Sequence, residues 1–283
     1  YTLKERRITN NDELALLRLP EDQSGRIFRD LGFKLNRSMV SVHQFSAGTQ
    51  YMDLTTICVP AGLTCGKYYH YRTLDDAGRS DFHTDIFRTL TGQYLWSTYI
   101  RLRCTPSYRL VRPHTNCALR KNDLISLPVI GRDDSIVFEI TATEKENTVS
   151  TVLFQFSMPH TNNSGVRMIR VFNVEIPLST DINSIYASVD EGALVTMVDR
   201  LATSNLLQKG PIPGKELTMK QIQTLCSLPN VNLSSFYHLV HSMMCNSAFR
   251  DAHPYGVDGR MLQVIGLRVI NVKNLILYLY PRM

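Results

Sequence analysis

Hydrophobic and polar residues follow three successive patterns along the chain, and each pattern predicts a different kind of structure. In 1–98, short strand-like runs such as Tyr68–Tyr71 alternate with stretches of helical spacing such as Phe82–Leu95. Alternation of period two dominates 99–178, and helical spacing returns in 179–283. The sequence therefore predicts three domains: an α/β domain, an antiparallel β domain and an all-α domain.

Several start and stop signals define elements in the first domain. Ser24-Gly25 is expected to open a helix, and Met39–Phe45 alternates as a strand does. Asp53 is expected to cap a short helix, and Asp81 the helix of Phe82–Leu95. Strands that alternate with helices predict a parallel sheet.

The second domain is expected to contain a long hairpin. Val152–Met158 has one apolar face, Asn162–Gly165 supplies turn residues, and Arg167–Ile176 forms the partner strand. The apolar face of the partner strand switches near Val171-Phe172, which predicts a bulge or burial on both sides.

The third domain is predicted to consist of helices. Two of them follow Asp181 and Asp190, and two more cover Leu233–Cys245 and Asp258–Ile270, the last with Asp258 as its cap. The Pro- and Gly-rich stretch Gln208–Gly214 is predicted to be a loop.

Composition and charge narrow the classes of protein. The chain is 43% hydrophobic and 20% charged over 283 residues, which is typical of a globular protein with two or three cores. Its net charge of +6 favours anionic partners such as acidic peptides or lipid headgroups. No nucleic-acid-reading signature occurs, so we expect no nucleic-acid partner. No apolar run is as long as a membrane span.

Enzyme and metal signatures are missing from the sequence. It has no Gly-rich phosphate loop and no nucleophile elbow, so we expect no catalytic residue. His238 and His241 lie one helical turn apart, a spacing more typical of surface or core residues than of metal ligands. The cysteines have no close paired spacing, so we expect reduced thiols and no metal site. They are Cys58, Cys65, Cys104, Cys117, Cys226 and Cys245.

The strand predicted at Tyr99–Cys104 carries the candidate binding residues. Its alternation places Arg101 and Arg103 on one face. Ile100 and Leu102 then point to the other face. Two arginines on one strand face can be a solvated outer surface, or they can bind two carboxylates.

Several short stretches occur in an order that resembles a known family. They are Tyr99–Cys104, Lys121–Pro128, Asn163–Val171 with Ile176-Pro177, Ile185–Asp190, Ala248–Arg250 and Tyr280-Pro281. In the same order they resemble motifs of the cargo-adaptor subunit of the COPII inner coat, the Sec24 family. No single stretch is specific, but their collinear order is.

The resemblance implies an architecture. The chain would be a piece of a longer protein, running from the late trunk through the helical domain. It would contain the C-terminal part of a von Willebrand A-like α/β trunk, an antiparallel β-sandwich and a helical domain. The zinc finger of the family lies upstream, so no cofactor is expected in this chain.

The resemblance also implies a function. It implies a non-catalytic, cytoplasmic coat subunit, peripheral on endoplasmic reticulum exit sites and COPII vesicles. Arg101 and Arg103 match an Arg-x-Arg pair that belongs to a pocket for acidic export signals of cargo and SNARE proteins. The implied partners are the other inner-coat subunit as a heterodimer, an anionic membrane surface and, indirectly, a Sar-type GTPase. The alternative is that partner subunit, which activates GTP hydrolysis by the GTPase.

Overall fold

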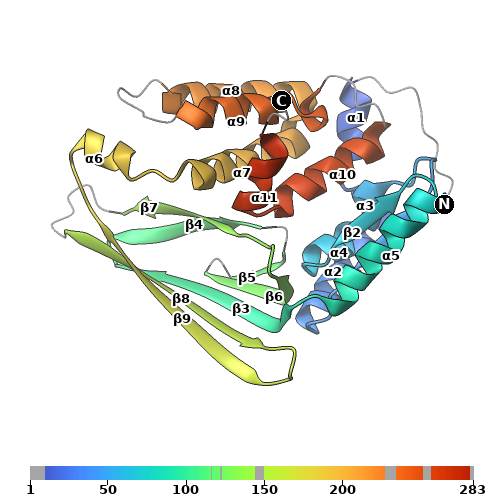
Figure 1. Cartoon of the computed structure of the whole chain (residues 1–283), viewed down its shortest axis with the longest axis horizontal. Coiled ribbons are helices and arrows are strands. Elements are labelled where there is room, and N and C mark those ends of the chain that lie inside the picture. Colours follow the sequence, from blue (N-terminus) through green and yellow to red (C-terminus); the bar gives the residue numbers. More distant parts are fainter. Residues whose placement is uncertain are drawn as a thin grey trace. The chain divides into compact units, whose positions relative to one another are not determined.

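The computed structural model of the chain describes residues 10–115, 117–121, 123–143, 150–226, 234–250 and 256–280 (Figure 1). The chain divides into two compact units. One consists of residues 20–134 and 138–176, and the other contains the rest of the described chain. The three domains 1–98, 99–178 and 179–283 stay a prediction.

The first unit combines four helices with three sheets in its described residues. Its helices are α2 (Gln23–Arg37), α3 (Leu54–Ile57), α4 (Val59–Leu63) and α5 (Asp76–Thr91). Its strands are β1 (Gln44–Ala47), β2 (Tyr68–Tyr71), β3 (Tyr94–Cys104), β4 (Tyr108–His114), β5 (Leu119–Lys121), β6 (Leu124–Gly131), β7 (Val137–Ala142), β8 (Thr151–Thr161) and β9 (Arg167–Pro177).

A sandwich forms the larger part of this unit. Its main sheet has the order β5-β6-β3-β8-β9, and β3 pairs antiparallel with both β6 and β8. The second sheet pairs β4 with β7 (Figure 1). Phe138 of β7 contacts Phe156 of β8 with ring centroids 5.5 Å apart, so side chains of the two sheets meet in one core. The predicted antiparallel β-sandwich is confirmed.

The α/β part is built on the parallel pair β1 and β2, in which Gln44 lies opposite Tyr68. Phe45 stacks on Tyr69 at 4.8 Å, and Phe82 of α5 meets Phe45 edge-on at 6.0 Å. These aromatic contacts attach α5 to the strand pair. The expected parallel pairing and the β2 bounds are confirmed.

Two boundaries and one helix cap in this part differ from expectation. Met39 has a φ of 56°, and the regular strand begins only at Gln44. Helix α5 starts five residues before Asp81, because the Asp75 side chain accepts a hydrogen bond from the Gly78 amide and caps it. Asp53 stands at the start of α3, but its φ is 57° and its side chain makes no cap hydrogen bond.

The exposure of strand β9 contradicts one of the two alternatives expected for Arg167–Ile176. Every residue of this strand is exposed on both faces, including Phe172 and Ile169. β9 is the last strand of the five-stranded sheet, so within the described chain only β8 pairs with it. Its apolar residues therefore lie on the surface. Of the two expected alternatives, burial on both sides is wrong, and the bulge near Val171-Phe172 stays a prediction.

Two links attach the α/β helices to the sandwich. Buried Asn36 of α2 donates to the carbonyl oxygens of Leu63 at 2.9 Å and of Ser126 in β6 at 3.1 Å. Cys65 and Cys117 form a disulfide, with their Cα atoms 5.5 Å apart. The expectation of reduced thiols was wrong for this pair, because the fold brings together two cysteines 52 residues apart. Among the described residues, Cys58, Cys104 and Cys245 are not part of a disulfide.

The second unit is helical. Its elements are α1 (Asn10–Leu17), α6 (Ile182–Ala187), α7 (Glu191–Lys209), α8 (Pro211–Cys226), α9 (Ser234–Met244), the 3₁₀ turn η1 (Ser247–Phe249), α10 (Gly256–Val269) and α11 (Val272–Leu279). None of the helices in the described residues is both long enough and apolar enough to cross a membrane.

The stretch Gln208–Gly214 is not the predicted loop. Helix α7 ends at Lys209, and Gly210 alone, with a φ of 93°, separates it from α8. Proline fits the first turn of a helix, so Pro211 starts α8 rather than marking a loop. Asp258 lies inside the first turn of α10 instead of capping it.

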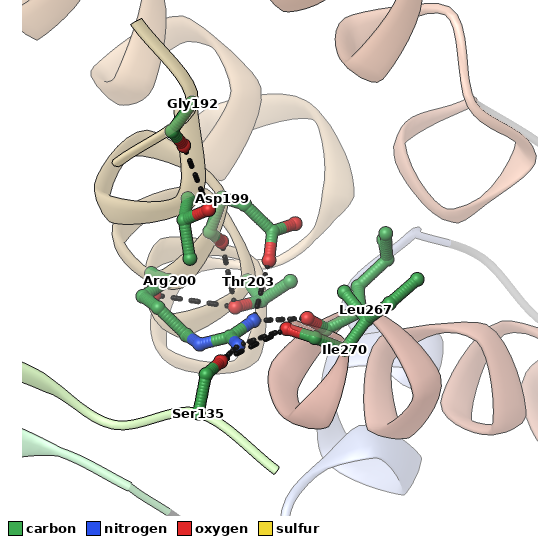
Figure 2. A network of polar contacts seen from close by, with 8 residues as sticks. Ser135, Gly192, Asp199, Arg200, Thr203, Leu267 and Ile270 are labelled. Carbon is green, nitrogen blue, oxygen red and sulfur yellow. Dashed lines mark hydrogen bonds and ion pairs between the residues drawn. The ribbon is translucent and has the colours of Figure 1, made fainter. Parts of the chain in front are cut away.

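A buried arginine organises the centre of this unit (Figure 2). Nη1 of Arg200 donates to Asp199 Oδ2 at 2.7 Å and to the Leu267 carbonyl oxygen. Nη2 donates to the Ile270 carbonyl oxygen at 2.7 Å and to Ser135 Oγ at 3.1 Å. The side chain thus binds the carbonyl groups at the end of α10, which have no partner within the helix itself.

A second buried arginine attaches α1. Arg260 of α10 is fully buried, and its Nε lies 2.5 Å from Oε1 of Glu13. Its Nη1 donates to the carbonyl oxygens of Ala248 and Arg250 at 2.5 and 2.8 Å. One guanidinium therefore connects α1, α10 and the η1 turn.

Arg260→Ala should destabilise the protein by about 3–5 kcal/mol, because it leaves Glu13 as a buried charge without its cation. Urea unfolding followed by circular dichroism measures the change. Lys273→Ala, at an exposed position of α11, is the control and should stay within about 0.5 kcal/mol. If Arg260→Ala lowered the free energy of unfolding as little as the control does, the ion pair of Arg260 and Glu13 would contribute little to stability.

Asp199 should make stability depend on pH. Burial raises the pKa of Asp199 to about 7, above its ordinary value of 3.8, although Arg200 opposes the rise. The folded protein then binds the proton more tightly, so the free energy of unfolding falls as pH rises from about 4 to about 7. Asp199→Asn removes this titration and should flatten the fall. Urea unfolding at each pH measures the free energy of unfolding of both proteins. An equal fall with pH in wild type and Asp199→Asn would show that Asp199 is not the titrating group.

Candidate functional site

The candidate residues Arg101 and Arg103 lie on β3, the central strand of the five-stranded sheet. Ile100 and Leu102 are only 9% and 4% exposed, while both arginines are exposed. Side chains alternate along a strand, so burial of the apolar pair directs the arginines outward. The alternation expected for Tyr99–Cys104 is confirmed, and the arginine face of β3 is an outer face of the sheet.

Neutral side chains lie beside the arginines on β8. Arg101 is opposite Ser157 and Arg103 is opposite Gln155. The Gln155 amide donates to Asn173 Oδ1 on β9 at 3.0 Å. Side chains directly opposite one another share a face, so the arginines are followed across the sheet by uncharged hydrogen-bonding groups.

Arg101 has an acidic neighbour that the sequence did not reveal. Its Nε and Nη2 both lie 2.8 Å from Oδ2 of Asp123, just before β6. This hydrogen bond is the main reason why the pKa of Asp123 lies below its ordinary value of 3.8. The side chains are 46% and 38% exposed, so the pair contributes only about 0–1 kcal/mol.

Arg103 differs from Arg101. None of the ion pairs formed within the described part of the chain includes Arg103. Gln155 lies opposite Arg103, so the side chain that faces this guanidinium on β8 is neutral. The two arginines therefore share a face but not an electrostatic environment.

Arg120 of β5 adds a third cation to this face. Its guanidinium lies 5.3 Å from the centre of the Tyr99 ring, and Nη2 donates to the Arg37 carbonyl oxygen at 3.2 Å. A cation over a tyrosine ring is attracted by the negative face of the ring. Sequence reasoning missed Arg120 and Asp123, whose positions depend on how β5 and β6 pair beside β3.

Other candidates have structural or surface positions. Nη1 of Arg167 donates to the Ser97 carbonyl oxygen at 2.7 Å and to Thr161 Oγ1 at 3.1 Å, which connects β9 to β3. His238 and His241 are exposed on α9. The described residues hold no cluster of three or more metal-ligating side chains.

Three comparisons relate the chain to known proteins. Residues 95–179 match the model of the Sec23/Sec24 beta-sandwich domain. Protein transport protein SEC24 A of Arabidopsis thaliana is 27% identical over 71% of this chain, and protein transport protein sec24 of Aspergillus fumigatus is 25% identical over 90%. The chain therefore contains a domain similar to the Sec23/Sec24 beta-sandwich and is similar along most of its length to Sec24 proteins.

A solved structure has the same fold. The human COPII-coat protein Sec24c matches 98% of this chain with a TM-score of 0.87 at 17% identity. The chain covers 19% and 30% of the plant and fungal Sec24 proteins and 38% of the human chain. It therefore corresponds to less than two fifths of each of these three relatives.

Proposed function

We propose that this chain is part of a COPII vesicle-coat subunit that selects cargo for transport from the endoplasmic reticulum to the Golgi. In this proposal Arg101 and Arg103 bind acidic export signals of cargo and SNARE proteins. The observation that carries it is the pair of exposed guanidinium groups on one face of β3, within a domain that matches the Sec23/Sec24 beta-sandwich.

The spacing of the arginines suits an extended peptide. Residues two apart on a strand are about 6.6–6.8 Å apart, both in the protein and in an extended ligand. Two carboxylates at that spacing can each meet one guanidinium, which offers two parallel N–H donors. Each charge-assisted contact contributes about 1.5–3 kcal/mol, so two of them need apolar contacts as well to reach micromolar affinity.

The proposed subunit is a non-catalytic adaptor. The alternative is the other inner-coat subunit, which activates GTP hydrolysis, and the matching domain model covers both kinds of subunit. The plant and fungal relatives are both named Sec24, which supports the cargo adaptor.

The proposal includes the setting of the coat. The other inner-coat subunit would be the heterodimer partner, and a Sar-type GTPase would act beside them. The protein would lie in the cytoplasm, peripheral on an anionic membrane at exit sites. The net charge of +6 supports attraction to such a surface.

Removing both guanidinium groups should weaken the binding of an acidic cargo-tail peptide by at least about tenfold, because the charge-assisted contacts are lost. The measurement is titration calorimetry of the full-length protein, in complex with its coat partner, comparing wild type with Arg101→Ala/Arg103→Ala. Added salt should weaken wild-type binding, since exposed charges are screened.

Arg109→Ala is the matched control, because Arg109 is also an exposed strand arginine but lies on β4 of the second sheet. The Arg109→Ala protein should bind the acidic peptide with the affinity of wild type. Lysine at position 101 or 103 should restore binding only in part, because it lacks the planar fork. Equal affinities for wild type and the double alanine variant would end the proposal.

A further inference from the structure

We propose that Asp123 is a built-in competitor for the acidic ligand at Arg101, which makes Arg103 the primary anchor of the site. The inference rests on the proposed function, since it concerns which carboxylates the arginine face of β3 accepts. It assigns unequal roles to two arginines that the sequence alone presents as equivalent.

The contact geometry carries the first step. Asp123 Oδ2 bridges Nε and Nη2 of Arg101, each at 2.8 Å. These two nitrogens form one of the edges at which a guanidinium binds a carboxylate through two parallel hydrogen bonds. A ligand carboxylate that approaches this edge must therefore displace Asp123.

Exposure makes this displacement feasible. Both side chains are more than a third exposed, so Asp123 can rotate into water without leaving a buried charge. The competition is consequently weak. It reduces the binding free energy that a ligand carboxylate gains at Arg101, but it does not prevent binding there.

Arg103 has no such competitor among the described residues. It faces Gln155, whose amide is already engaged with Asn173, so no carboxylate has to leave before a ligand binds. A ligand with a single acidic residue should therefore bind at Arg103. A second acidic residue two positions away reaches Arg101, where it adds less binding free energy than the first residue does at Arg103.

Arg120 does not repeat the role of Arg101. It lies over the Tyr99 ring and donates to a backbone carbonyl oxygen, so its partners are neutral. It adds positive potential to the face. Asp123 is thus an acidic group in contact with the arginine face of β3. It can set the preference of this face between ligands with one and with two acidic residues.

The test compares two synthetic extended peptides, one with aspartates two residues apart and one in which the aspartate aimed at Arg101 is asparagine. Asp123→Asn in the full-length protein should tighten binding of the two-aspartate peptide about two- to fivefold. It should tighten binding of the one-aspartate peptide less, so the ratio of the two affinities rises. Asp30→Asn, which removes an exposed carboxylate on α2, should leave the ratio unchanged.

A double-mutant cycle separates competition from positioning. Arg101→Ala should weaken binding of the two-aspartate peptide more in the Asp123→Asn protein than in wild type. If Asp123 instead held Arg101 in place for the ligand, Asp123→Asn would weaken binding, which overturns the inference. An unchanged affinity ratio overturns it as well. Asp123→Ser serves as a second variant, and circular dichroism checks the fold of each.

The two proposals fail in different ways. If Arg101→Ala/Arg103→Ala leaves peptide binding intact, the proposed function itself is wrong. If that variant loses binding while neither Asp123 variant changes the affinity ratio, the arginine face of β3 still binds acidic ligands and only the role of Asp123 is wrong.

Discussion

Hydrogen bonding of β3 on both sides is the constraint on which the arginine face depends. β6 and β8 pair with the strand along its two edges, and a slip of one residue would turn every side chain to the opposite face. Burial of Ile100 and Leu102 excludes that slip. The pairing with β8 shifts register between Trp96 and Arg101, and Arg167 donates to the Ser97 carbonyl oxygen within that stretch. From Arg101 onward the register is regular.

The sequence predicted the parts of this site that depend on local periodicity. Alternation from Tyr99 to Cys104 can be read from the residue types alone, so the shared face of Arg101 and Arg103 was predictable. Asp123 lies 22 residues from Arg101, and its contact exists only because β6 pairs beside β3. A partner that depends on tertiary pairing leaves no periodic signal, so the unequal environments of the two arginines could not be predicted.

The difference between local periodicity and tertiary contacts also explains where the predicted fold was wrong. Pro211 and Pro213 suggest a loop, but prolines also fit the first turn of a helix, and α8 uses them there. The Cys65–Cys117 disulfide joins residues that only the docking of α4 beside the sandwich brings together. Arg200 and Arg260 are charged residue types that a sequence reading assigns to the surface, yet each finds enough carbonyl and carboxylate acceptors to be buried.

The exposure of β9 determines how the roles of its residues can be studied. A core residue resists substitution because its loss leaves a cavity, but Ile169, Phe172 and Val174 have open solvent around them in the described chain. A mutational scan that scores only folding of this chain would rate such positions as tolerant. Their apolar character would then look accidental, and any selection acting on them for a role other than folding would go unseen. A scan of β9 is therefore informative only when it also scores a property other than folding.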